Sequence, residues 1–145
     1  EIGMYAKKFM RTGEIHPIAR HGNETEEIFY DSVEDMMAFL HEKLSANWKT
    51  TAIICKTEDD LHFIKERMKE PFHILDGHTE KFEAGLLLTT IQYAKGLEFD
   101  HVIVPFVDAG RYATDFDQGL LYIATTRAMH ELTMLINQKV SSKLL

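Results

Sequence analysis

The sequence predicts an α/β fold in which a mostly parallel sheet is flanked by helices. Segments with helical periodicity alternate with short apolar runs along the 145 residues. The runs AIIC, LLL and VIV are apolar without a break, which is typical of strands buried on both faces of a parallel sheet. With 45% hydrophobic residues, a chain of this length can bury one full core and hardly two. We therefore predict a single domain over residues 1–145.

Composition narrows the classes of function. The only cysteine, Cys55, excludes a disulfide framework and favours a reducing compartment. No apolar stretch reaches the roughly 18–20 residues of a membrane-spanning helix, and no signal sequence opens the chain, so we predict a cytoplasmic protein without a membrane partner. The eight histidines are scattered without metal-site spacing, and no metal ligands are predicted. The net charge of -7 argues against strong binding to a phosphate backbone by this chain alone.

The first half of the chain shows five predicted elements. Apolar residues at helical spacing predict a helix over 1–11, and its start without a cap indicates a piece of a longer chain. An extended segment is expected near 28–30. Ser32 is the predicted N-cap of a helix with an apolar stripe that reaches Leu44. TTAIIC then predicts a strand, and Thr57 the N-cap of a helix with acids in its first turn and bases in its last.

The second half is richer in strands. FHILD, GLLLTT and HVIVPF have strand length, and a helix over about 116–129 precedes a strand at ELTMLI. In open α/β sheets ligands bind at the carboxyl ends of strands. The loops after Cys55, Thr90 and Phe106 are therefore the expected places for functional groups.

Residues 90–105, TIQYAKGLEFDHVIVP, place charged residues between two predicted strands. The ten residues from Ile91 to Asp100 are barely enough for a crossover between parallel strands, so this segment must be compact. Gly96 permits a backbone conformation or a close approach that other residues resist. One interpretation is a tight turn with a solvated Lys95 and Glu98. The other is a ligand loop in which Glu98 accepts ribose hydroxyls.

A second candidate site is LLYIATTRAMHEL, residues 120–132. On a helix, Arg127 would fall in the middle of the apolar face and would need a partner. A structural interpretation is a buried ion pair or a charge at the helix C-terminus. A functional interpretation is an arginine presented to a phosphate, which its planar fork suits. Thr125 and Thr126 fit either interpretation.

Other polar and aromatic residues favour structural roles. CKTEDD could imitate an acidic metal site, but Thr57 as an N-cap explains it better. Trp48 and Tyr112 could stack on bases, although lone loop aromatics are more often packing residues. DAGRYATDFD, residues 108–117, is predicted to be an exposed polar loop, which could face DNA or a partner protein.

Together the two candidate segments resemble motifs V and VI of superfamily-one helicases of the UvrD/Rep type. The order, the spacing and the flanking strands match. RHG, AIICKTEDD and YAKGLEFD resemble the HelD-like branch most, so the resemblance covers nearly the whole chain. It implies a RecA-like three-layer domain, the C-terminal motor domain of a longer helicase. Only about 34 residues separate Cys55 from Thr90, where UvrD-type proteins carry a large insertion, so no inserted subdomain is expected.

The resemblance also implies roles for individual residues. Glu98 resembles the motif V acid near the nucleotide ribose, and Arg127 the motif VI arginine that contacts the γ-phosphate and is catalytic. Gly96 belongs to the same nucleotide-binding set. Thr90 and Gln92 resemble positions that link the nucleotide cleft to DNA, although many UvrD-type proteins carry His where Gln92 stands.

The predicted function is therefore the C-terminal half of an ATP-dependent DNA helicase or translocase that moves on single-stranded DNA. The chain has no phosphate-binding loop and no strand ending in Asp-Glu, so ATP and Mg²⁺ would be held mainly by the N-terminal RecA-like domain of the same protein. The fragment alone is predicted to be inactive as an ATP hydrolase. Two alternatives stay open: a HelD-like ATPase that acts on RNA polymerase, and a catalytically silent interaction domain.

Overall fold

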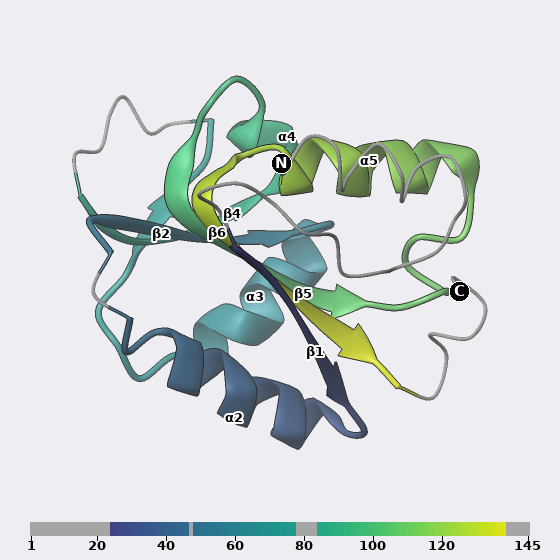
Figure 1. Ribbon diagram of the computed structural model, residues 1–145, viewed down its shortest axis with the longest axis horizontal. Coiled ribbons are helices and arrows are strands. Elements are labelled where there is room, and N and C mark those ends of the chain that lie inside the picture. Colours follow the sequence, from purple (N-terminus) through teal and green to yellow (C-terminus); the bar gives the residue numbers. More distant parts are fainter. Residues whose placement is uncertain (1–23, 47, 78–83, 139–145) are drawn as a thin grey trace.

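The sheet has six strands in the order β1-β6-β5-β2-β4-β3, with helices on both faces (Figure 1). The computed structural model describes residues 24–46, 48–77 and 84–138. In chain order the elements are β1 (Glu24–Tyr30), α2 (Val33–Lys43), β2 (Thr50–Cys55), α3 (Glu58–Arg67), β3 (His73–Leu75), β4 (Gly85–Thr90), α4 (Ile91–Ala94), β5 (Phe99–Val107), α5 (Asp115–Thr125) and β6 (Ala128–Asn137). The helix predicted over 1–11 lies outside the described residues.

All five strand pairings are parallel, which confirms the α/β class with a parallel sheet. Figure 1 shows α4 and α5 on one face of the sheet and α2 and α3 on the other. A parallel sheet needs cover on both faces because its strands are apolar on both sides. The domain therefore has three layers, with the strands in the middle.

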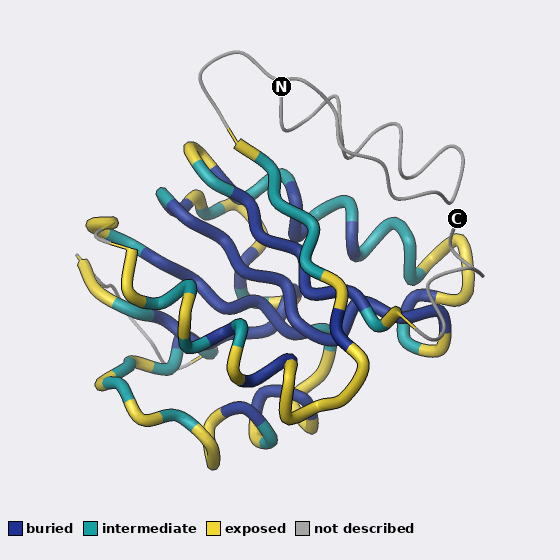
Figure 2. The backbone as a smooth tube through the Cα atoms, turned by 60° about the horizontal axis from the view of Figure 1, so that its bottom comes forward, coloured by how far each residue is buried: buried dark blue, intermediate teal, exposed yellow. Residues whose placement is uncertain are grey.

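Each face of the sheet contributes to its own apolar core, and the central strands are the most buried part of the chain (Figure 2). The core beneath α4 and α5 includes Ile91, Phe99, Val102, Tyr112 and Leu121. The core beneath α2 and α3 includes Met36, Leu40, Ile53, Ile64 and Ile103. β5 alternates between these cores, so a shift of its register by one residue would exchange the two sets.

Polar side chains cap three helices at their N-termini. The Ser32 hydroxyl accepts a hydrogen bond from the backbone N–H of Asp35 at 3.1 Å, and the Thr57 hydroxyl accepts one from Asp60 at 3.2 Å. Both caps were predicted from the sequence and are confirmed. Thr114 and Asp117 form a reciprocal capping box at the start of α5. Such a cap satisfies N–H groups that have no partner within the helix.

The boundary between α5 and β6 differs from the prediction. The helix ends at Thr125 rather than near 129, and β6 begins at Ala128 rather than 131. Helical spacing of apolar residues continues past Thr126, but Ala128 pairs with Phe99 of β5 and so belongs to the sheet. Arg127 therefore lies in the connection between helix and strand, and not on the apolar face of the helix.

Cys55 is the last residue of β2 and is 1% exposed. Burial raises the pKa of its thiol well above the usual range, so the thiolate is scarce at neutral pH. We expect a thiol reagent to label native protein far more slowly than protein in denaturant, with labelling followed by mass spectrometry. Equal rates in both states would contradict the buried position. No helix in the described part of the chain is long and apolar enough to cross a membrane.

Candidate functional site

The two candidate segments meet at the edge of the sheet where β5 and β6 begin. The backbone N–H of Phe99 donates to the carbonyl oxygen of Arg127 at 2.9 Å. Phe99 is also paired in the sheet with Ala128, the residue that follows Arg127. Glu98 and Arg127 therefore lie at the starts of neighbouring strands, although they are far apart in the sequence. We call this the amino edge.

This position differs from the expectation that functional groups follow the carboxyl ends of strands. Of the candidate residues, only Thr90 and Gln92 lie at the carboxyl end of a strand, β4. α4 is a single turn, and the chain then runs back to the edge where the parallel strand β5 starts. The last residues of any parallel crossover lie at the amino edge, which is where this chain carries Glu98 and Arg127.

Gly96 adopts a left-handed backbone conformation, with φ of +81°. A Cβ atom built at this position would meet no heavy atom within 4 Å. The backbone conformation, and not close packing, therefore requires glycine here. The sequence prediction that Gly96 serves a special backbone conformation is confirmed. The turn exposes Lys95 and Glu98 to solvent and returns the chain to buried Phe99.

The side chain of Arg127 is half-buried and sparsely bonded. Its Nη2 donates to the hydroxyl of Thr126 at 3.0 Å, and its buried Nε has no hydrogen-bond partner among the described residues. Within the same residues no carboxylate forms an ion pair with it, so the structural interpretation as a buried ion pair has no support there. A buried N–H without a partner is costly, and a bound anion would satisfy it.

Thr90 and Gln92 lie at the other end of the crossover. Thr90 ends β4 and is 3% exposed, and its hydroxyl oxygen lacks a partner in the described part of the chain. Gln92 is exposed on α4. The structure thus places Thr90 and Gln92 at the start of the segment whose end carries Glu98. The compact crossover physically connects the two ends of the sheet.

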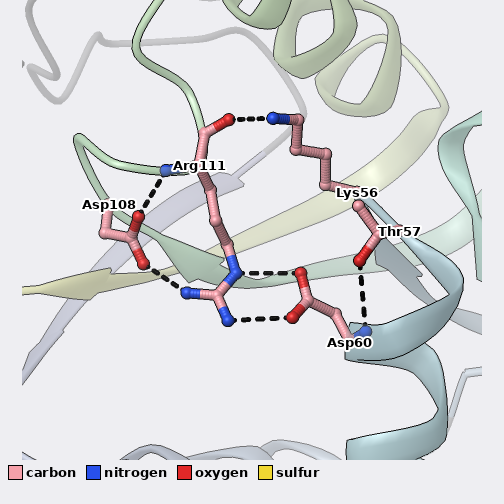
Figure 3. Close-up of polar contacts among 5 residues, drawn as sticks. All are labelled: Lys56, Thr57, Asp60, Asp108 and Arg111. Carbon is pink, nitrogen blue, oxygen red and sulfur yellow. Dashed lines mark hydrogen bonds and ion pairs between the residues drawn. The ribbon is translucent and has the colours of Figure 1, made fainter.

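At the opposite edge, where the parallel strands end, Arg111 bonds to side chains from two segments (Figure 3). We call this the carboxyl edge. Nε and Nη2 of Arg111 each donate to the carboxylate of Asp60 at 2.8 Å, and its Nη1 donates to Asp108 at 2.6 Å. The Asp60 carboxylate, followed by that of Asp108, raises the pKa of Arg111 above its usual range. The guanidinium also lies over the ring of Phe106, 4.2 Å from its centroid.

This network corrects the exposure predicted for the first part of residues 108–117, whereas residues 113–116 are exposed as predicted. That the segment faces DNA or a partner stays a prediction. Asp108 and Tyr112 are buried, and Lys56 donates to the carbonyl oxygen of Arg111 and pairs with Asp117 at 3.0 Å. The loop is held by ion pairs from α3 and from the end of β2. The sequence offered one hint, because Asp60 stands next to the apolar face of its helix.

Trp48 packs against protein rather than standing free. Its ring stacks on His130 at 5.5 Å between centroids, and its indole N–H donates to Glu131 at 2.8 Å. Tyr112 is completely buried, and burial raises the pKa of its hydroxyl. Both aromatics therefore have the packing role that the sequence favoured.

Known proteins match the segment that carries both candidate motifs. Residues 85–135 match the family model of the UvrD-like helicase C-terminal domain. This segment is similar to UvrD-like helicases. It includes Thr90, Gln92, Gly96, Glu98 and Arg127. No curated protein sequence matches the chain.

Two solved structures support the fold over most of the chain. The C-terminal domain of a possible DNA helicase from Lactobacillus plantarum WCFS1 is 27% identical, with a TM-score of 0.77 over 97% of this chain and 88% of that chain. The Escherichia coli DEAD-box protein SrmB, solved bound to regulator of ribonuclease activity A, is 15% identical, with a TM-score of 0.54 over 82% of this chain and 79% of that chain. The second match shows the fold alone. The arrangement is RecA-like, as the resemblance implied.

Proposed function

We propose that the chain is the C-terminal motor domain of an ATP-dependent DNA helicase or translocase. One observation carries the proposal: the hydrogen bond between Phe99 and Arg127 places Glu98 and Arg127 together at the amino edge. The similarity to UvrD-like helicase C-terminal domains covers both residues and supports the same conclusion.

The chemistry of the amino edge suits a nucleotide. Arg127 offers a permanent positive charge and a buried Nε without a partner among the described residues, which fits a phosphate oxygen. Glu98 offers an exposed carboxylate that can accept hydrogen bonds from ribose hydroxyls. In this proposal Arg127 stabilises the charge on the transferring phosphoryl group, as arginine fingers do.

In this proposal the remaining groups needed for ATP hydrolysis lie in an N-terminal motor domain of the full-length protein. That domain would supply the phosphate-binding loop and the Mg²⁺ ligands, since the present sequence contains neither motif. Thr90 and Gln92 would link the nucleotide cleft to single-stranded DNA through the crossover that they share with Glu98. The HelD-like branch and RNA polymerase as a partner stay predictions from the sequence.

Glu98→Ala in the full-length protein tests the nucleotide site. We expect the KM for ATP to rise about 3–10-fold with a smaller effect on kcat, because a hydrogen bond to ground-state ribose is lost. Wild-type protein should also prefer ATP over 2′,3′-dideoxy-ATP, and the variant should bind both equally. The matched control is Glu58→Ala, which removes an acid at the carboxyl edge. A variant that kept the preference for ATP would exclude Glu98 from the ribose.

The isolated chain should bind nucleotide only weakly. It supplies one acid, one arginine and a glycine turn, whereas the phosphate loop and Mg²⁺ contribute most of the binding energy. We expect a millimolar dissociation constant for a non-hydrolysable ATP analogue, on the order of 4 kcal/mol, and no hydrolysis. Its net charge of -7 similarly predicts negligible binding of single-stranded DNA at physiological salt. Micromolar binding in calorimetry or in fluorescence anisotropy would favour a self-sufficient domain.

A further inference from the structure

The hydroxyl of Thr126 lies between the end of α5 and the guanidinium of Arg127. It donates to the carbonyl oxygen of Ile123 at 2.7 Å, and it accepts from Nη2 of Arg127 at 3.0 Å. A hydroxyl has one proton, a carbonyl oxygen only accepts, and a guanidinium only donates. The direction of both bonds is therefore determined: the lone pairs of Thr126 face Arg127.

The backbone of Arg127 is held on both sides. Its N–H donates to the carbonyl oxygen of Ala124 at 3.2 Å, and its own carbonyl oxygen accepts from Phe99 at 2.9 Å. Its remaining freedom lies in the long side chain, and the bond to Thr126 restricts that freedom. The Thr126 hydroxyl accepts from Nη2, and the N–H of Nε, which has no partner among the described residues, can donate to another acceptor.

We infer that Thr126 is a positioning residue for Arg127, which it holds in the orientation that meets the transferring phosphoryl group. The inference rests on the proposed function of Arg127. An arginine that is already oriented loses less side-chain freedom when the contact forms. Since the contact serves the transition state, the effect of Thr126 should appear in kcat rather than in KM.

Thr125 distinguishes this role from simple capping of the helix. Its hydroxyl donates to the carbonyl oxygen of Tyr122 at 2.9 Å, the same bond to the third residue back that Thr126 makes. No hydrogen bond between Thr125 and Arg127 occurs in the described structure. Thr125→Val and Thr126→Val therefore each remove an equivalent bond to the helix backbone, but only the second also removes an acceptor for Arg127.

The test is steady-state ATP hydrolysis by the full-length protein with saturating single-stranded DNA. We expect Thr126→Val to lower kcat about tenfold, as for one lost charge-assisted hydrogen bond, with KM within about twofold. Thr126→Ser keeps the hydroxyl and should stay within about twofold of wild type, as should Thr125→Val. In an Arg127→Ala background, Thr126→Val should lower kcat no further. Thermal melting verifies that each variant is folded.

Three results would overturn the inference and leave the proposed function standing. An equal loss of kcat in Thr125→Val and Thr126→Val would assign the effect to the helix end. An undiminished effect of Thr126→Val in the Arg127→Ala background would show that Thr126 does not act through Arg127. If Thr126→Val kept the wild-type kcat while Arg127→Ala was impaired, only the inference about Thr126 would fail. Normal hydrolysis by Arg127→Ala would instead overturn the proposed function, and this inference with it.

Discussion

Arg127→Ala in the full-length protein is expected to lower the rate of ATP hydrolysis by about 10³ or more while ATP binding stays within a few-fold. The amino edge presents this guanidinium with one side-chain bond, to Thr126, and with a buried Nε that lacks a partner in the described residues. A group that acts mainly on transition-state charge affects turnover more than ground-state binding. Single-turnover hydrolysis and a binding titration with an ATP analogue measure the two quantities separately.

Arg127→Lys is the informative companion. Lysine keeps the charge but not the planar fork, so it should restore little of the lost rate. If both variants kept nearly normal hydrolysis and only melted at a lower temperature, Arg127 would be a structural residue at the end of the helix. The proposed function would then lose its phosphate contact.

Among all the substitutions proposed, Arg111→Ala should lower the free energy of unfolding most. The substitution leaves Asp60 and Asp108, each 8% exposed, without the guanidinium that pairs with both. Breaking a buried ion pair is costly because a desolvated carboxylate remains, and the 35% exposure of the Arg111 side chain reduces the effect. We expect a loss of about 2–3 kcal/mol in the free energy of unfolding, measured by urea denaturation.

Arg67→Ala provides a matched control for the change from arginine to alanine. The Arg67 side chain is 45% exposed and lies 3.9 Å from Glu66, and it donates to a carbonyl oxygen of its own helix. Its loss should cost less than about 1 kcal/mol. Similar losses for the two variants would mean that the network at the carboxyl edge contributes no more than an ordinary surface contact.

Much of the fold follows from local sequence rules. Ser32 and Thr57 cap helices because a hydroxyl accepts from an N–H three residues later, and that spacing is visible in the sequence. Unbroken apolar runs identify β2, β4 and β5 because a strand covered on both faces has no polar side. The boundary between α5 and β6 is not predictable in this way. Apolar spacing continues across it, and the interaction that ends the helical pattern comes from Phe99, which is distant in the sequence.

The residues of the candidate site could be predicted from the sequence, but their arrangement in space could not. Glu98, Gly96 and Arg127 could be proposed from their motifs, whereas their shared position at the amino edge depends on strand pairing. The ion pair of Arg111 could not be predicted, since its main partner Asp60 is 51 residues away and the local pattern explains Asp60 as an acid in the first turn of its helix. The role of Thr126 likewise depends on which way a hydroxyl points, and the sequence does not contain that information.

The pairing of β1 with β6 has a consequence for synthesis of the protein. Among the described strands, β1 lies at the edge of the sheet and pairs with β6, the last of them in the sequence. During translation, the backbone of β1 therefore cannot pair with β6 until β6 has left the ribosome. Contacts between distant segments slow folding because a long loop must close before they form, and an unpaired strand can meanwhile bind other chains. Nascent chains that stop before Ala128 should therefore depend on chaperones more than the finished domain does.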